Sequence, residues 1–177
     1  MIISNQQRAE NFQEYLLLLQ DPNYLDVTFD DQSGGVSAIH IKHRFDNKTG
    51  AFGIKKGDYE RIVVDILRHK GHTIILTSEL APNGIKTSDG YLDDVIMDIK
   101  AIESNGKWAI KDKLHRAAKQ GAACVILYFH KKELFSHERM NDGWTKFLED
   151  KDSKNYRGII KRVLCIVEDK VTIWEIA

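Results

Sequence analysis

Two carboxylates and a lysine lie within one short stretch of this sequence, residues 89–100. In an extended strand successive side chains point to opposite faces, so Asp98 and Lys100 share one face and their apolar neighbours share the other. Asp89 lies upstream of Asp98 across a short segment that contains Gly90, and a hairpin or bend in that segment would return its carboxylate toward Asp98. Mg²⁺ prefers hard oxygen ligands and is commonly held by one or two carboxylates together with phosphate oxygens. The stretch therefore predicts a site for a divalent cation.

Lys100 adds a group that can act on a phosphate. Beside a bound cation, its ammonium could orient or activate a water, or neutralise charge that develops on a scissile phosphate. The alternative is a strand with a solvated polar face and an ordinary pair between Asp98 and Lys100. Asp93 and Asp94 lie on the same segment as Asp89 and compete with it as the first metal ligand, because spacing alone does not separate them.

Histidines and basic residues elsewhere are candidates for contact with a nucleic acid. His40 and His43 could bind a metal or act as a general acid and base, as in metal-independent ribonucleases, although such histidines more often have a structural role. Arg44 could contact a phosphate backbone. The candidate nucleic-acid contacts are His40, His43, Arg44 and Lys113.

Hydrophobic periodicity and turn residues predict the elements that hold these groups. Residues 123–129 form a continuous apolar run, typical of a central strand covered on both sides. Glu60 lies at the border of a buried helical stripe, where a carboxylate is costly unless it is functional or paired. The predicted order is helix 58–70, strand 73–79, a turn at 82–84, strand 85–92, strand 94–102, helix 111–121 and strand 123–129, with a first helix before Pro22 and a C-terminal hairpin at 162–167 and 171–176.

Composition sets the class of protein. The chain has 177 residues, 42% of them hydrophobic, which predicts one domain with a substantial core and a small N-terminal extension. Lys and Arg total 26, as do Asp and Glu, so no global basic field indicates a non-specific DNA binder. Cys124 and Cys165 lie in apolar runs and are predicted to be buried free thiols in a reducing compartment. We expect a cytoplasmic protein without a membrane partner, since no export signal or membrane-spanning run is present.

The element order and the acidic residues together resemble the PD-(D/E)xK, or restriction-endonuclease-like, nuclease superfamily, with Ser88-Asp89 in place of the usual Pro-Asp and Asp98-Ile99-Lys100 as the second half of the motif. The resemblance implies an α/β (α+β) fold with an αβββαβ core, in which a mixed central sheet is flanked by helices. It divides the chain into an N-terminal extension, residues 1–47, and a catalytic domain, residues 48–177, that ends in a C-terminal β-hairpin.

The same resemblance implies roles for the site residues. Asp89 and Asp98 would coordinate Mg²⁺ or Mn²⁺, and Glu60 on the first core helix would contribute directly or through water. Lys100 would position the attacking water or stabilise the transition state. Gln120 would orient Lys100 or a phosphate, because Lys113, Ala117 and Gln120 match a Lys-x-x-x-Ala-x-x-Gln motif that is frequent in the superfamily.

Within the superfamily, the segments around Asp89, Lys100 and Gln120 are similar to C-terminal toxin domains of contact-dependent growth inhibition and phage-borne polymorphic systems. That similarity implies a ribonuclease that cleaves tRNA in the cytoplasm of a target bacterium after delivery by a larger protein. It also implies a cognate immunity protein as a partner. The sequence indicates no oligomeric state.

Three other functions fit the same residues. One is a DNA endonuclease of the repair, restriction or Holliday-junction-resolving type on the same fold. A second is a non-catalytic interaction domain in which these charges form structural pairs. The third is a metal-free ribonuclease that uses His40 and His43.

Overall fold

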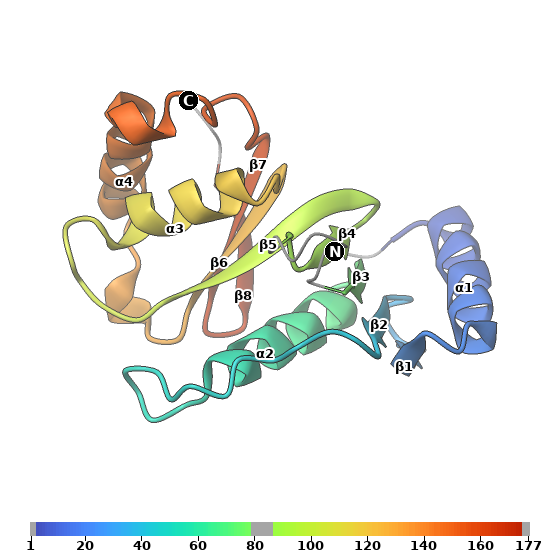
Figure 1. Ribbon diagram of the computed structural model, residues 1–177. Helices are drawn as coiled ribbons and strands as arrows, with labels where there is room; N and C mark the ends of the chain where they lie inside the picture. The colour runs from blue at the N-terminus through green and yellow to red at the C-terminus, as the bar shows by residue number, and fades with distance from the viewer. Residues whose placement is uncertain (1–2, 79–86, 175–177) are drawn as a thin grey trace.

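The protein folds around a single sheet with helices on both faces (Figure 1). The computed structural model describes residues 3–78 and 87–174. The elements in chain order are α1 (Asn5–Gln20), β1 (Tyr24–Phe29), β2 (Val36–His40), α2 (Lys56–His69), β3 (Thr73–Leu76), β4 (Gly90–Leu92), β5 (Val95–Ile102), α3 (Ala109–Lys119), β6 (Cys124–Phe129), α4 (His137–Glu149), β7 (Arg162–Val167) and β8 (Lys170–Trp174), with 3₁₀ turns at Lys132–Leu134 and Lys151–Ser153.

The eight strands of the sheet lie side by side in chain order, from β1 to β8. Three neighbouring pairs are parallel, β2 with β3, β5 with β6 and β6 with β7, and the others are antiparallel. A parallel pair needs a crossover connection, which α2, α3 and α4 provide in turn. The mixed α/β class is confirmed. The predicted order of helix, three strands, helix and strand is the order of α2, β3, β4, β5, α3 and β6.

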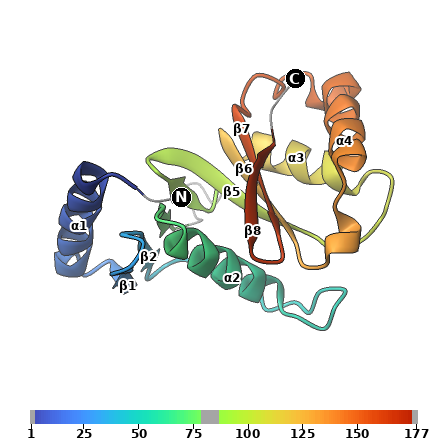
Figure 2. The same ribbon diagram turned by 180° about the vertical axis from the view of Figure 1, so that it is seen from behind.

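Two hydrophobic cores hold the helices against opposite faces of the sheet, as the two views show (Figure 1; Figure 2). On one face, α2 packs through Val63 and Leu67 with Met97 and other strand residues. On the other face, α3 and α4 pack through Leu114 and Phe147 with residues of β6 and β7. Every residue of β6 is buried, which confirms the prediction of a central strand. Cys124 and Cys165 are buried free thiols, as predicted.

Both edges of the sheet contain antiparallel pairs. The predicted C-terminal hairpin is confirmed, with β7 paired to β8. The expected extension, residues 1–47, contains α1, β1 and β2, and its two strands belong to the same sheet as β3. Part of the predicted strands 73–79 and 85–92, together with the turn at 82–84, lies outside the described residues. In the part of the chain that the structure describes, no helix is long and apolar enough to cross a membrane.

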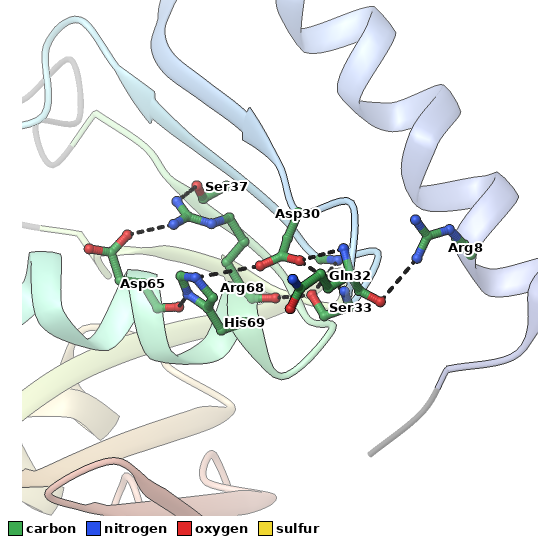
Figure 3. Close-up of polar contacts among 9 residues, drawn as sticks. Arg8, Asp30, Gln32, Ser33, Ser37, Asp65, Arg68 and His69 are labelled. Atoms are coloured by element: carbon green, nitrogen blue, oxygen red, sulfur yellow. Dashed lines mark hydrogen bonds and ion pairs between the residues drawn. The ribbon is translucent and has the colours of Figure 1, made fainter.

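Polar contacts tie the N-terminal segment to the end of α2 (Figure 3). Asp30 accepts hydrogen bonds from the backbone N–H groups of Gln32 and Ser33, which close the turn between β1 and β2. The Ser33 hydroxyl donates to the Arg68 carbonyl at 2.7 Å, and the Arg68 guanidinium donates to Ser37 on β2 at 3.1 Å. From the other side, Arg8 of α1 donates to the Gln32 carbonyl. These bonds fix α2 against β2.

The hairpin that joins β4 to β5 turns at Asp93 and Asp94, where the strands predicted at 85–92 and 94–102 meet. Both aspartates have positive φ, 48° and 64°, and the strand pairing Leu92 with Val95 makes them a two-residue loop. Turns of this kind match the twist of the strands, and Asp tolerates the left-handed conformation better than most residues. Gly90 lies within β4, where a Cβ atom would stand 1.9 Å from the Ile75 carbonyl oxygen.

This close approach predicts that Gly90→Ala destabilises the protein by about 2 kcal/mol or more, because the added methyl group must displace backbone of β3. Urea unfolding followed by circular dichroism measures the change. Gly158→Ala is the matched control, since its Cβ would meet no heavy atom within 4 Å. Equal stability of the two variants would contradict the close packing of β4 against β3.

Candidate active site

Strand β5 places Asp98 and Lys100 on the face that α3 covers. Their pairing partners on β6, Val125 and Leu127, belong to the core beneath α3 and α4. Asp98 is fully buried, and its Oδ2 lies 2.5 Å from the Lys100 Nζ. The predicted arrangement of the two side chains on one face of a strand is therefore what the structure has.

Asp89 lies beside Asp98 because β4 is short. The antiparallel pair of Gly90 with Met97 is the last along this edge, so the next residues outward are Asp89 and Asp98. Beyond that point the backbone N–H of Ile99 donates to Asp89 Oδ2 at 2.7 Å. Asp89 thereby takes the place that a longer β4 would fill, and its side chain is buried with it.

The Asp98 carboxylate is in an electrostatically costly position. Burial raises its pKa well above the usual range, the charge of Asp89 raises it further, and Lys100 opposes both effects. Neither Asp98 oxygen accepts a hydrogen bond from the described residues, and the ion pair with Lys100 offsets part of the cost of burying this carboxylate. Two buried carboxylates and one ammonium leave an excess of negative charge, which a cation would neutralise.

A cavity of about 530 Å³ adjoins Lys100 at the open edge of β5, between α2 and α3. Asp89 and Asp98 do not line it and lie behind Lys100. Its basic residues outnumber its acidic ones by five to three, so the cavity favours an anion. The basic residues are Lys56, Lys100, Lys113, Arg116 and Lys119, and the acidic ones are Asp46, Glu60 and Glu103.

Helix α3 contributes a polar face to this cavity. Lys113, Arg116 and Gln120 follow one another at i, i+3 and i+7, so they lie on the same side of the helix. Burial lowers the pKa of Lys113, and so do the nearby charges of Lys56, Arg116 and Lys100. Sequence reasoning selected Lys113 and Gln120 and missed Lys56 and Arg116, although the helical spacing was a signal for Arg116.

Gln120, to which the resemblance gives the role of orienting Lys100 or a phosphate, lies at the end of α3 and lines the cavity with Lys100. Its Nε2 donates to the Thr87 carbonyl at 3.0 Å, two residues before Asp89. The contact joins the end of α3 to the segment that carries the first carboxylate. Gln120 therefore holds the position of Asp89, while its side chain still lines the cavity.

Glu60 reaches the same cavity from α2 and is held by His43. Its Oε2 lies 2.9 Å from His43 Nε2, and His43 Nδ1 lies 2.9 Å from the Thr77 carbonyl oxygen. The His43 side chain is fully buried, so in this arrangement it has no surface for the nucleic-acid contact that the sequence suggested. His43 and Glu60 form a structural pair at the border of the cavity.

The other candidates lie apart from this group. His40 accepts a hydrogen bond from the Lys42 backbone N–H and packs edge-on against Tyr24. Arg44 is exposed and is not among the residues that line the cavity. Asp93 contacts His72 Nδ1 at 2.7 Å, and with Asp94 it borders a different cavity, beside α1. Asp89 is therefore the aspartate that the structure brings to Asp98.

The donor set fits a hard divalent cation that keeps several waters. Among residues 3–78 and 87–174, no three histidine, cysteine or carboxylate groups converge as a complete metal cage. Mg²⁺ does not need such a cage, because it commonly binds one or two carboxylates plus water and substrate phosphate. The Asp98 oxygens, which accept no hydrogen bond from the described residues, and the neighbouring Asp89 carboxylate suit this mode.

Comparisons of the chain with protein-family models, with curated proteins and with solved structures find no match.

The buried carboxylate predicts an unusual response to Asp98→Asn. In metal-free buffer the variant should be more stable than the parent protein at neutral pH, because a neutral amide avoids the cost of burying a charge beside Asp89. Because the folded pKa is raised, the parent loses stability as pH rises from the ordinary Asp value of about 4 through the raised value. Urea unfolding over that range in EDTA measures both effects.

Asp94→Asn is the control for this measurement, because Asp94 is an exposed turn residue whose φ asparagine also tolerates. If Asp98→Asn were less stable than the parent at every pH, Asp98 would be half of a stabilising structural pair instead of a strained ligand.

Proposed function

We propose that the chain is a metal-dependent phosphodiesterase of the PD-(D/E)xK type that cleaves nucleic acid. The observation that carries this proposal is the buried Asp98 beside Asp89 and Lys100, of which Lys100 lines a cationic cavity. Ion-pair networks also perturb pKa values, but a charge excess next to an open cavity is the arrangement expected of a functional site.

In this proposal Asp89 and Asp98 hold Mg²⁺ or Mn²⁺, and Glu60 contributes through water from the opposite wall. The cation would act as a Lewis acid on a phosphate oxygen and lower the pKa of a bound water. Asp89 Oδ2 accepts a hydrogen bond from the backbone N–H of Ile99, and this bond fixes the orientation of the carboxylate. Lys100 exchanges its pairing with Asp98 for a contact to the attacking water or to charge that develops on the phosphate.

The basic wall of the cavity supplies the contacts to the nucleic-acid backbone. Lys56, Lys113 and Arg116 line the cavity with Lys100, and burial together with the repulsion among these charges lowers the pKa of Lys113. Phosphates of a polynucleotide would relieve that repulsion on either side of the cleaved bond. A cavity that can hold one phosphate at its centre and further phosphates along its rim suits a chain of nucleotides.

The sequence resemblance extends the proposal to a substrate and a setting. We propose RNA, and tRNA in particular, as the substrate, with action in the cytoplasm of a target bacterium and a cognate immunity protein as the inhibitor. DNA cleavage would move the protein to the repair, restriction or resolvase type. A metal-free mechanism on His40 and His43 receives no support from geometry, because the His43 ring is buried against Glu60.

Asp98→Ala and Lys100→Ala should each lower the cleavage rate by at least about 100-fold, a typical loss for a group that acts in proton transfer or charge stabilisation. The assay follows total tRNA and plasmid DNA on gels with Mg²⁺ and with EDTA. Asp94→Ala is the control and should stay near the parent rate. Full activity of either site variant, or activity in EDTA, would overturn the proposed mechanism.

Lys113→Gln and Arg116→Gln should weaken nucleic-acid binding and reduce its dependence on salt. Each lost phosphate contact lowers the slope of log K against log salt concentration by about 0.7 for a single strand. Fluorescence anisotropy with a labelled RNA, on an Asp98→Asn background that does not cleave, measures the slope. Lys154→Gln, an exposed site outside the cavity, should leave the slope unchanged. Equal slopes in all variants would exclude the cavity as the binding surface.

A further inference from the structure

The contact between His43 and Glu60 joins two parts of the chain at the border of the cavity. A backbone carbonyl only accepts hydrogen bonds, so His43 Nδ1 must donate to Thr77 across the 2.9 Å contact. On the other side, Nε2 faces a carboxylate oxygen at 2.9 Å, and one proton between the two atoms makes this contact a hydrogen bond. The imidazole ring is therefore fixed at both nitrogens.

Packing fixes the same ring from its face. Phe45 contacts the His43 ring edge-on, with 4.8 Å between the ring centroids, and the Arg61 guanidinium lies 3.8 Å from the Phe45 centroid. The segment that carries Phe45 lies directly on the first turn of α2, where a Cβ atom on Gly57 would stand 2.5 Å from the Phe45 Cβ. His43 has little freedom to move relative to the helix that carries Glu60.

Glu60 has a different environment from His43. Its side chain keeps 15% of its surface exposed, whereas the His43 side chain has none, and Glu60 lines the cavity with Lys100. One oxygen of the Glu60 carboxylate therefore contacts a buried, immobile imidazole, and the carboxylate also borders the cavity that Lys100 lines.

We propose that His43 is a positioning residue that holds the Glu60 carboxylate toward the cation and its waters. This inference rests on the proposed function, because it assigns Glu60 to the metal site of that function. A buried imidazole and carboxylate cost desolvation energy that an apolar pair would avoid, so a packing role alone does not require these residue types. Residues that orient a ligand in this way typically change metal affinity by about 10-fold to 100-fold when they are replaced.

Mn²⁺ binding, measured by isothermal titration calorimetry, tests the role without reference to catalysis. His43→Leu removes both hydrogen bonds and should weaken Mn²⁺ binding by about 10-fold. His43→Gln can still donate to Glu60 and should recover most of the affinity. The double variant His43→Leu with Glu60→Gln should bind no more weakly than Glu60→Gln alone, because His43 acts only through Glu60.

His43→Asn provides a second test if His43→Leu does not fold. The asparagine amide can still donate to the Thr77 carbonyl but is too short to reach Glu60. His43→Asn should therefore weaken Mn²⁺ binding as much as His43→Leu does. In cleavage assays the Mn²⁺ concentration for half-maximal rate should rise by the same factor, while the rate at saturating Mn²⁺ stays within about threefold of the parent rate. A merely structural role would lower the melting temperature without this shift.

Two results would overturn the inference, and they differ from failure of the proposed function. The first result is that the parent protein binds Mn²⁺, that Asp98→Asn abolishes this binding, and that the folded His43 variants bind Mn²⁺ as tightly as the parent does. In that case only the role of His43 is wrong. If the losses from His43→Leu and Glu60→Gln multiply in the double variant, His43 does not act through Glu60. If the parent protein binds no Mn²⁺, the proposed function and this inference fail together.

Discussion

The burial of one carboxylate, that of Asp98, is the constraint on which the site depends. Strand β5 runs through the middle of the sheet, and its side chains on both faces are covered by helices. Placing an aspartate there removes it from water, and placing Asp89 next to it adds repulsion between like charges. Lys100 offsets part of this cost. A divalent cation would offset more of it, so relief of this repulsion would favour cation binding.

The fold produces this arrangement by interrupting one strand. Strand β4 covers only the first residues of β5, and the edge beyond Met97 opens toward the cavity. On that edge, Asp89 accepts a hydrogen bond from the backbone N–H of Ile99. Gln120 donates to the Thr87 carbonyl and so holds the segment that carries Asp89. Helices α2 and α3 stand on opposite faces of the sheet and both reach this opening, which is how Glu60 and Arg116 come to line one cavity.

Local patterns were sufficient to predict the central part of the fold. The alternation around Asp98, the apolar run of β6 and the stripes of α2 and α3 each depend on residues close in sequence. The partnership of Asp89 with Asp98 was also accessible, because a hairpin joins them. The turn lies where the strands predicted at 85–92 and 94–102 meet, although the sequence did not indicate that Asp93 and Asp94 both adopt positive φ.

Contacts between distant segments could not be predicted in the same way. The parallel pairing of β2 with β3 places residues 36–39 in the same sheet as the central strands, and nothing local in the sequence indicates which strand is the neighbour. His43 meets Glu60 and Thr77 across 17 and 34 residues. The sequence showed that Glu60 needed a partner or a function, and only the structure identified His43 as its partner.

An anomalous difference map from crystals grown with Mn²⁺ tests the central claim most directly. The account predicts a Mn²⁺ peak within direct coordination distance, about 2.0–2.3 Å, of carboxylate oxygens of both Asp89 and Asp98, with Lys100 turned toward the cavity. A map without a peak at this place, in crystals where Lys100 keeps its contact with Asp98, would show that these charges form a structural pair.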